Sequence, residues 1–333
     1  MINFGILGFG LHAVKRLMPG FALARNCRVT ALSRRDLTKA RESARQYDIP
    51  LAFDSADELC RAPEVDAVFV ATPNACHLHD VLTAVACGKP VLCEKPMAID
   101  AGQCRQMVEA AQKAKTLLGV AHVFRFEDST AWFREQVAAG NIGNPIFARS
   151  EFSFSAAHGH ARTWINDPAI AGGGPVADVG VHCIDTLRFI LQDEVLRVTA
   201  REIAGRRSGQ VEAGAAILLE FSRGTVATVM VSFRAEYRTP LEVVGDAGVL
   251  RADDALNVEH PIQLELRRGS EVHTSVVSNQ LAYARQVDAF AAAVERKAEF
   301  PIPGEQGWRN QEILDAAYRS MKSGRSEDVQ KIA

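Results

Sequence analysis

The sequence predicts an α/β protein, in which an N-terminal doubly wound parallel sheet precedes a C-terminal α/β domain with a large, mostly antiparallel open sheet. Three observations predict this fold class. Apolar and helix-forming segments alternate through the first 120 residues, a glycine-rich turn follows the first apolar segment, and extended segments fill most of residues 195–277. Alternation gives right-handed crossovers between parallel strands, whereas short turns between extended segments give antiparallel pairs. We therefore expect domains at 1–120 and 121–333.

Composition narrows the class of protein. The chain has 333 residues, 47% hydrophobic and 23% charged, with a formal net charge of −2. This balance provides no basic field for nucleic acid or an anionic membrane, and no apolar run approaches the roughly 18 residues of a membrane span. The N-terminal apolar run lacks a basic flank, so we expect a cytoplasmic protein. Seven cysteines without a Cys-x-x-Cys pair argue against a disulfide framework and a structural zinc site.

The first predicted strand, residues 2–7, leads through a glycine-rich turn into a helix-forming segment. The turn has the pattern Gly-x-Gly-x-x-Ala and includes Gly8, Phe9, Gly10, Leu11 and Ala13. In this pattern the first glycine permits a tight turn, the second lets the backbone approach a pyrophosphate, and the small third residue allows close helix packing. The helix N-terminus adds N–H donors for phosphate. The stretch predicts a dinucleotide site, with an ordinary tight turn as the alternative.

The second predicted strand, residues 28–32, ends in Ser33, Arg34 and Arg35. In sites that prefer NAD, an acidic residue near this point accepts hydrogen bonds from ribose hydroxyls. A serine hydroxyl and two guanidinium groups would instead bind a 2′-phosphate through charge-assisted bonds. We therefore favour NADP(H). NAD(H) is the alternative, because Asp36 would supply the acid if the strand ended later, and the two arginines could simply begin a solvated helix.

Strands and helices continue to alternate up to residue 121. We expect helices at 36–47, 57–62, 75–87 and 100–114, and strands at 51–53, 65–72, 90–93 and 116–121. Two strands end in polar turns at the edge where such sheets bind ligands, and these turns contain Thr72, Pro73 and Asn74 with His77, and Glu94, Lys95 and Pro96. A charged turn is often only solvated. Proline nevertheless confines Lys95 to the strand end, and the Lys95–Pro96 peptide is a candidate for the cis form.

The regular alternation stops near residue 122, where the second domain begins. We expect a helix at 128–139, a strand at 145–155, extended segments at 195–202, 215–221, 225–233, 240–244, 248–251, 262–268 and 272–277, and covering helices at 281–295 and 305–320. A sheet covered on one face leaves the other face free to pair with a second subunit. The C-terminal sheet is therefore a candidate surface for pairing with a second copy of the chain.

Two polar stretches of the second domain are candidates for chemistry. A loop contains His158, His160, Arg162 and Trp164, but no third ligand follows at metal-binding spacing, so we expect a surface or substrate loop and no metal site. Residues 171–185 read AGGGPVADVGVHCID, in which Asp178 and His182 would share one face of a helix. A carboxylate beside an imidazole suits general acid–base chemistry near neutral pH. An ordinary solvated polar pair is the alternative.

Together these motifs resemble the glucose-fructose oxidoreductase / inositol dehydrogenase (Gfo/Idh/MocA) family. The resemblance is carried by Gly8-x-Gly10, Thr72-Pro73-Asn74 with His77, Gly88-Lys89-Pro90 before Glu94-Lys95-Pro96, and Gly172-Gly173-Gly174 with Asp178 and His182. These motifs fall in order along nearly the whole chain, and the last is most similar to the 1,5-anhydro-D-fructose reductase type, which also prefers NADPH. The segment from His122 to Phe126 departs from the family pattern, and residues 156–164 match no substrate signature.

The resemblance implies a Rossmann domain and the oxidation or reduction of a sugar or polyol hydroxyl or carbonyl with NAD(P). It also implies a homodimer or homotetramer that forms through the large open C-terminal sheet. It implies that Lys95, Asp178 and His182 are catalytic. Candidate cofactor contacts are the residues of the glycine turn, the arginine pair with Ser33, the turn from Thr72 to His77, and Glu94 with Lys95. Candidate substrate contacts are His122, Arg125 and Trp164, beside the three catalytic residues. A glycosidase that uses bound NAD transiently and a non-catalytic cofactor-sensing protein remain alternatives.

Overall fold

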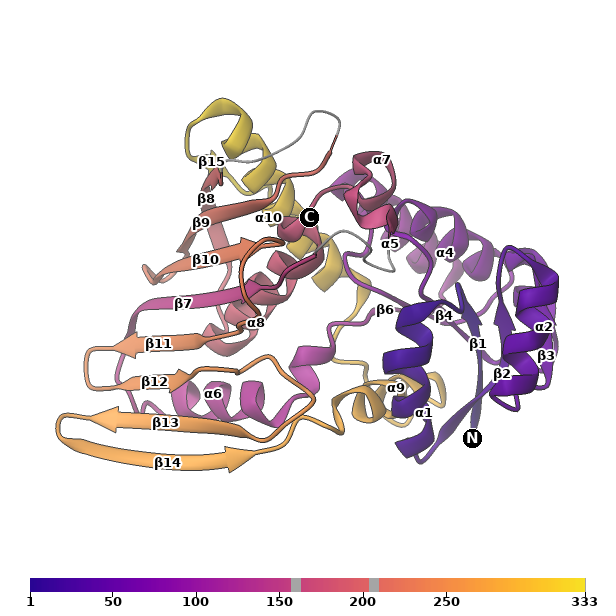
Figure 1. The fold of residues 1–333 in the computed structure, drawn as a ribbon, viewed down its shortest axis with the longest axis horizontal. Helices are drawn as coiled ribbons and strands as arrows, with labels where there is room; N and C mark the ends of the chain where they lie inside the picture. Colours follow the sequence, from indigo (N-terminus) through magenta and orange to yellow (C-terminus); the bar gives the residue numbers. More distant parts are fainter. Residues whose placement is uncertain (157–162, 204–209, 333) are drawn as a thin grey trace. The chain divides into compact units, whose positions relative to one another are not determined.

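The computed structural model describes residues 1–156, 163–203 and 210–332, and the chain divides into two compact units. The first unit consists of Met1–His122 together with Tyr283–Gln311, and the second of Val123–Ala282 together with the segment from Glu312 onward (Figure 1). The sequence division at residue 120 does not include the return of the chain to the first unit. No helix in the described ranges has the length and apolar character needed to cross a membrane.

The first unit is built on a parallel sheet with the order β3-β2-β1-β4-β5-β6. Its strands are β1 (Ile2–Leu7), β2 (Cys27–Ser33), β3 (Leu51–Phe53), β4 (Ala67–Val70), β5 (Val91–Cys93) and β6 (Leu118–Val120). The order reverses beside β1, so the ends of β1, β2 and β4 meet at the switch point where doubly wound sheets bind ligands. The predicted parallel sheet is confirmed.

Five helices connect these strands. They are α1 (Met18–Leu23), which continues a π-helical turn η1 (Ala13–Leu17), α2 (Leu37–Gln46), α3 (Ala56–Arg61), α4 (His77–Ala86), which follows a short 3₁₀ turn η2 (Asn74–Cys76), and α5 (Ala101–Ala114). Side-chain oxygens of Asp36, Ser55 and Asp100 accept N–H groups at the starts of α2, α3 and α5. These residue types satisfy the exposed N–H groups of a first helical turn, which explains where the helices begin.

The first unit is completed by a distant part of the chain, which includes α9 (Ala282–Val294) and the beginning of α10 (Gly304–Ser323). The Asp288 carboxylate on α9 accepts hydrogen bonds from the backbone N–H groups of Arg25, at 2.9 Å, and Asn26, at 3.0 Å. The Phe290 ring lies 6.0 Å from the Phe4 ring of β1. The sequence interpretation of α9 as a cover for the second sheet is therefore wrong, because α9 packs into the first unit.

The second unit contains a nine-stranded sheet with the order β14-β13-β12-β11-β7-β10-β9-β8-β15 in its described residues. The strands are β7 (Pro145–Ser153), β8 (Val195–Glu202), β9 (Gly214–Phe221), β10 (Val226–Ser232), β11 (Leu241–Gly245), β12 (Val249–Ala252), β13 (Ile262–Arg268), β14 (Glu271–Val277) and β15 (Glu327–Asp328). Neighbours are antiparallel except β7 and β10, which run parallel. The predicted large, mostly antiparallel sheet is confirmed.

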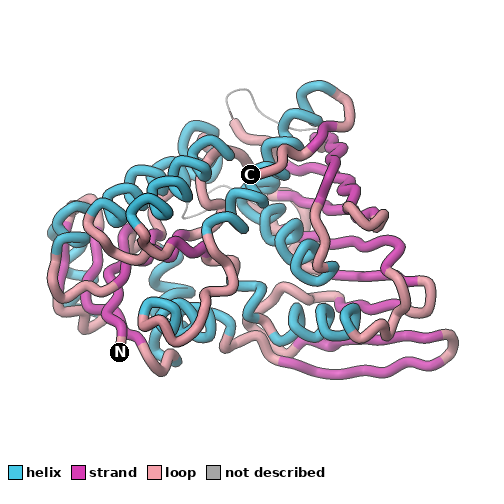
Figure 2. Tube along the Cα trace, turned by 180° about the vertical axis from the view of Figure 1, so that it is seen from behind, coloured by secondary structure: helices cyan, strands magenta, loops and turns pink. Residues whose placement is uncertain are grey.

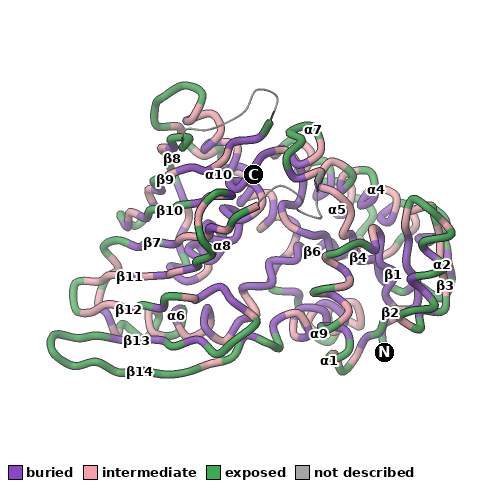
Figure 3. The backbone as a smooth tube through the Cα atoms, viewed as in Figure 1, coloured by how far each residue is buried: buried purple, intermediate pink, exposed green. Residues whose placement is uncertain are grey.

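Helices cover one face of this second sheet. They include α6 (Asp128–Ala138), after a short 3₁₀ turn η3 (Val123–Phe126), and α8 (Val181–Leu191), which continues a π-helical turn η5 (Val176–Gly180) and packs on β7 and β10. Figure 2 shows helices lying over the strands of this unit when it is seen from behind. Two short helices, η4 (Thr163–Asn166) and α7 (Pro168–Ala171), precede the glycine stretch. Strand β14 is exposed along nearly its whole length (Figure 3).

Candidate active site

The glycine turn after β1 packs directly against the loop that follows β4. Gly8 has a φ of +81°, a conformation that side chains disfavour, and a Cβ on it would lie 2.7 Å from the Thr72 Cα atom. The Phe9 N–H donates to the Ser33 carbonyl at 2.9 Å, which ties the turn to the end of β2. A Cβ on exposed Gly10 would meet only the Gly8 carbonyl, at 3.8 Å. The turn therefore leaves open space beside Gly10, where the backbone can approach a pyrophosphate.

The other residues of the glycine turn divide between core and surface. Phe9 is buried, with its ring 5.4 Å from the Tyr47 ring, and Ala13 is completely buried. Leu11 is exposed. Phe9 can therefore offer a ligand its backbone but not its side chain. Small Ala13 permits the close packing of the helix that the sequence pattern requires.

The end of β2 presents one buried hydroxyl and two arginines. Ser33 is buried, and Arg34 donates from Nη1 to the Ser43 Oγ atom of α2 at 2.8 Å. Arg35 is exposed. The carboxylate of Asp36 caps α2 by accepting the Lys39 N–H at 3.1 Å. Asp36 is thus engaged at the helix start, and two guanidinium groups remain the dominant charges at this strand end.

The turn after β4 is held by a buried histidine. The Thr72 hydroxyl donates to an Asp80 carboxylate oxygen at 2.7 Å. The His77 ring is completely buried, with Nε2 2.8 Å from the Thr72 carbonyl and Nδ1 3.1 Å from the Pro96 carbonyl. Burial lowers the pKa of His77 and raises the pKa of Asp80. The expected cofactor contact of His77 is replaced by a structural one, because its ring joins the turns after β4 and β5 and has no exposed surface. Asn74 is also buried.

A buried carboxylate connects the Lys95 turn to the glycine turn. Glu94 is 8% exposed, and its Oε1 atom lies 2.8 Å from the His12 Nε2 atom, while Oε2 accepts the Lys95 N–H at 3.2 Å. Burial acts to raise the pKa of Glu94, but His12 and Lys95 outweigh it and hold the pKa below its usual value. The Lys95–Pro96 peptide is cis, as the sequence predicted. His12 is a site residue that sequence reasoning missed, because it occupies a variable position of the glycine pattern.

In the second unit, Asp178 and His182 lie where the wide turn η5 leads into α8. Asp178 is half-buried and His182 is 7% exposed. The His182 ring stacks on the Phe124 ring, with centroids 4.2 Å apart and planes inclined by 28°. The Phe152 ring of β7 lies 6.2 Å away on a nearly parallel plane. Aromatic packing therefore fixes the orientation of the imidazole. Phe124 is a second site residue that sequence reasoning missed.

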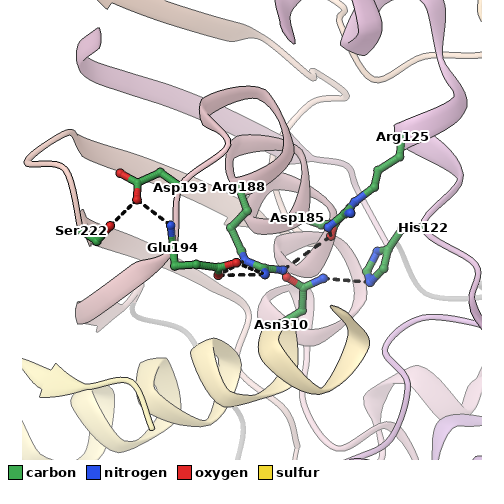
Figure 4. A network of polar contacts seen from close by, with 8 residues as sticks. All are labelled: His122, Arg125, Asp185, Arg188, Asp193, Glu194, Ser222 and Asn310. Carbon is green, nitrogen blue, oxygen red and sulfur yellow. Dashed lines mark hydrogen bonds and ion pairs between the residues drawn. The ribbon is translucent and has the colours of Figure 1, made fainter. Parts of the chain in front are cut away.

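Arg125 and His122, which the sequence assigned to substrate, have internal partners. Arg125 donates to the Asp185 carboxylate from Nε at 2.9 Å and from Nη2 at 2.6 Å, and Asp185 is almost completely buried (Figure 4). His122, in the first unit, is 1% exposed and lies 2.9 Å from the Asn310 amide nitrogen. Both side chains are engaged in these internal contacts, and contact of either one with substrate stays a prediction.

The Arg125–Asp185 pair belongs to a larger charged network on α8. Arg188 lies 4.0 Å from Asp185 and donates from Nε and Nη2 to the Glu194 carboxylate, both at 2.9 Å. Burial lowers the pKa of Arg188, against the effect of the two carboxylates. Such a network joins η3, α8 and the start of β8. It thereby connects the element that carries Phe124 to the helix that carries His182.

Of the remaining candidate residues, only Trp164 lies within the described part of the chain. Trp164 lies in η4 and is half-buried. His158, His160 and Arg162 lie outside the described residues. Within the ranges that the structure describes, no cluster of three or more His, Cys, Asp or Glu side chains could hold a metal ion, and the cysteines are all free.

Comparisons with known proteins agree with this fold. A family model described as "Oxidoreductase family, NAD-binding Rossmann fold" matches residues 2–122, and the "GFO/IDH/MocA C-terminal domain" model matches residues 130–251. The chain is similar to 1,5-anhydro-D-fructose reductase of Ensifer adhaerens, with 29% identity over 99% of each chain. It is also 30% identical to D-xylose 1-dehydrogenase (NADP(+)) 2 of Haloferax volcanii, over 98% of this chain and 99% of the relative.

A solved structure extends the likeness to the whole fold. Aldose-aldose oxidoreductase from Caulobacter crescentus, complexed with glycerol, has a TM-score of 0.91 and 26% identity, with 98% of this chain and 99% of that chain covered. Both domain models, the full-length relatives and this structure agree on the family that the motifs suggested. The chain belongs to the Gfo/Idh/MocA family of NAD-binding Rossmann oxidoreductases.

Proposed function

We propose that the protein transfers hydride between a nicotinamide cofactor and the carbon of a sugar or polyol hydroxyl or carbonyl group, with NADP(H) as the preferred cofactor. The proposal is supported chiefly by the buried Glu94 carboxylate, which fixes the Lys95 turn to the His12 position of the glycine turn. Lys95 is therefore held at a defined distance from the dinucleotide-binding backbone. The sugar class is supported by the sugar dehydrogenase and reductase names of the full-length relatives.

The residues of the chain fit a nicotinamide dinucleotide. Gly8 packs against the Thr72 backbone, exposed Gly10 has open space beside it, and the π turn that follows begins with buried Ala13. The glycine turn would hold the pyrophosphate, and the bound cofactor would supply the hydride acceptor or donor. The polar turn beginning at Thr72 would line the nicotinamide half.

Proton chemistry is assigned to three side chains. His182 exchanges the proton of the substrate hydroxyl as a general acid–base, because imidazole titrates near neutral pH. Lys95 donates a hydrogen bond to the same oxygen and stabilises the negative charge that develops there. Asp178 orients the substrate and the imidazole. The stacked Phe124 ring keeps the His182 imidazole in one orientation.

The test is turnover by matched variants. Wild type is assayed with 1,5-anhydro-D-fructose and NADPH and with D-xylose and NADP⁺, as part of a wider screen of sugars, inositols and keto-sugars. His182→Ala and Lys95→Ala should lower kcat by at least 10²-fold, the range of a lost acid–base or electrostatic group. The cofactor dissociation constant should change little for His182→Ala. Near-normal turnover in either variant contradicts the assignment.

The preference for NADP(H) rests on the end of β2. Arg34 is steadied by Ser43, Arg35 is exposed, and Asp36 caps a helix, so the ribose-facing charge is positive. A relative named as NADP(+)-dependent supports this choice. Arg35→Ala should weaken NADPH binding at least tenfold and leave NADH binding nearly unchanged, as measured by fluorescence titration. Equal weakening of both cofactors contradicts a 2′-phosphate role.

We also propose that the uncovered face of the second sheet pairs with a second copy of the chain, as a dimer or tetramer. Large apolar side chains are exposed there, including Phe147 of β7, Leu218 of β9 and Met230 of β10. Patches of this kind on a sheet typically mark subunit contacts. Light scattering after size exclusion should give a molar mass that is a multiple of the chain mass. Phe147→Lys should lower this molar mass.

A further inference from the structure

Two of the three glycines before the proposed catalytic helix are explained by what packs against them. A Cβ on Gly173 would overlap the hydroxyl of Tyr318, and a Cβ on Gly174 would overlap the main-chain oxygen of Glu212. Gly172 alone has a positive φ, of +75°, at the end of α7. The second and third glycines are therefore required by close packing, and the residues that approach them come from α10 and from the segment before β9.

Glu212 uses its side chain to bind the start of this helix. The carboxylate accepts the Gly174 N–H at 3.0 Å on both oxygens, and Oε1 also accepts the Val176 N–H at 3.1 Å. The Tyr318 hydroxyl donates to the same Oε1 atom at 3.0 Å. Glu212 is 2% exposed. Burial raises its pKa, and the surrounding N–H and O–H donors act in the opposite direction. The chain thus supplies its own anion to the positive end of the helix.

This contact reaches the proposed catalytic residues through the helix backbone. The Asp178 N–H donates to the Gly174 carbonyl at 2.9 Å, so the glycine that Glu212 holds also sets the position of Asp178. His182 follows four residues later, beyond the wide π turn of η5. A π turn is a less stable geometry than an α turn and is commonly found at functional sites. An anchor at Gly174 and Val176 fixes where this turn begins.

We infer that Glu212 is a positioning residue, which seats the N-terminal turn of the helix and thereby sets the placement of Asp178 and His182. The inference rests on the proposed function, because it assumes that these two residues act on the substrate. Glu212 itself is too deeply buried, at 2% exposure, to contact a substrate. Tyr318 of α10 helps to hold Glu212 in place, since its phenol donates a hydrogen bond to the carboxylate.

The test uses a graded series in the full chain. Glu212→Ala removes all of the contacts, Glu212→Gln keeps one acceptor oxygen and loses the charge, and Tyr318→Phe removes a single donor. Glu220→Gln is the matched control, because Glu220 lies on the following strand and its side chain is 44% exposed. Each variant is assayed at a temperature well below its thermal unfolding midpoint. The substrates are D-xylose with NADP⁺ and 1,5-anhydro-D-fructose with NADPH. Hydrogen exchange is followed by mass spectrometry over residues 172–183.

We expect kcat to fall at least tenfold in Glu212→Ala, less in Glu212→Gln, and least in Tyr318→Phe, with NADPH binding within twofold of wild type. Amide exchange over residues 172–183 should accelerate in the same order, while peptides of the first unit stay unchanged. If Glu212→Ala does not fold, the ranking of the other two variants carries the test. Wild-type kcat and wild-type exchange in folded Glu212→Gln and Tyr318→Phe, or an equal loss in Glu220→Gln, would overturn the inference.

The exchange measurement needs no substrate, which separates this inference from the proposed function. If His182→Ala retains turnover while Glu212→Ala accelerates exchange, the function is wrong and the seating of the helix stands. If His182→Ala loses turnover while the Glu212 variants keep both kcat and protection, the seating inference is wrong and the function stands.

Discussion

Removing the Asp185 carboxylate should destabilise the second unit strongly. In Asp185→Ala, Arg125 loses two hydrogen bonds, of 2.9 and 2.6 Å, from a side chain that is 10% exposed in the native protein. Arg188 keeps its paired bonds to Glu194, so the charge that loses its carboxylate is mainly that of Arg125. Breaking a buried ion pair on one side costs about 3–5 kcal/mol of unfolding free energy. We expect a loss in this range.

The assay is urea unfolding followed by tryptophan fluorescence, because Trp132 lies in α6 of the same unit. Asp57→Ala is the control, since the Asp57–Arg61 pair is 54% and 70% exposed and should contribute at most about 1 kcal/mol. The double variant Arg125→Met with Asp185→Leu leaves no charge unpaired and should recover most of the loss. A loss in Asp185→Ala no larger than in Asp57→Ala refutes the reasoning.

Three further predictions follow from buried groups of the two units. His77→Phe removes the two ring nitrogens that lie against the Thr72 and Pro96 carbonyls, one of which donates in the neutral imidazole that burial favours, and should lower the free energy of unfolding by about 1–3 kcal/mol. His79→Phe, at an exposed position of the same helix, should change it by less than about 0.5 kcal/mol in thermal unfolding. Gly8→Ala should abolish NADPH binding in fluorescence titration, because its Cβ would press on the Thr72 backbone. Unchanged affinity would contradict the assignment of the glycine turn to the pyrophosphate. Burial raises the pKa of Glu127 well above 4.5, so the native protein holds a proton that the unfolded chain releases. The free energy of unfolding should therefore fall as the pH rises above 4.5. Urea titrations at several pH values should show a flatter fall for Glu127→Gln than for wild type.

Local pattern predicted the elements well, because it depends only on neighbouring residues. The first strand was expected at residues 2–7 and is Ile2–Leu7, and strand β13 is likewise found at the predicted residues. Long-range pairing could not be predicted in the same way. The parallel partnership of β7 and β10, and the two-residue strand β15 beside β8, depend on chain segments far apart in sequence.

The site was predictable where a motif constrains the backbone and unpredictable where burial decides a role. Gly8 and the cis Lys95–Pro96 peptide follow from residue types whose conformational limits are known. His77 is completely buried although a cofactor contact is expected there, since a polar residue near a strand end gives no sign of whether its ring faces solvent or core. Glu212 left no signal at all, because a single acid before a strand is ordinary until its N–H partners are known.

The return of residues 283–311 to the first unit has a consequence for synthesis and for dissection of the protein. A fragment ending at His122 lacks α9, whose Asp288 and Phe290 contact the loop before β2 and the core of β1. The cofactor-binding unit is thus incomplete when its own strands have left the ribosome. At about 5–20 residues per second, roughly 10–40 s separate the emergence of β6 from that of the segment that completes it. During that interval the apolar surface that α9 later covers stays exposed on the nascent unit. A chaperone that binds nascent chains would bind at this surface.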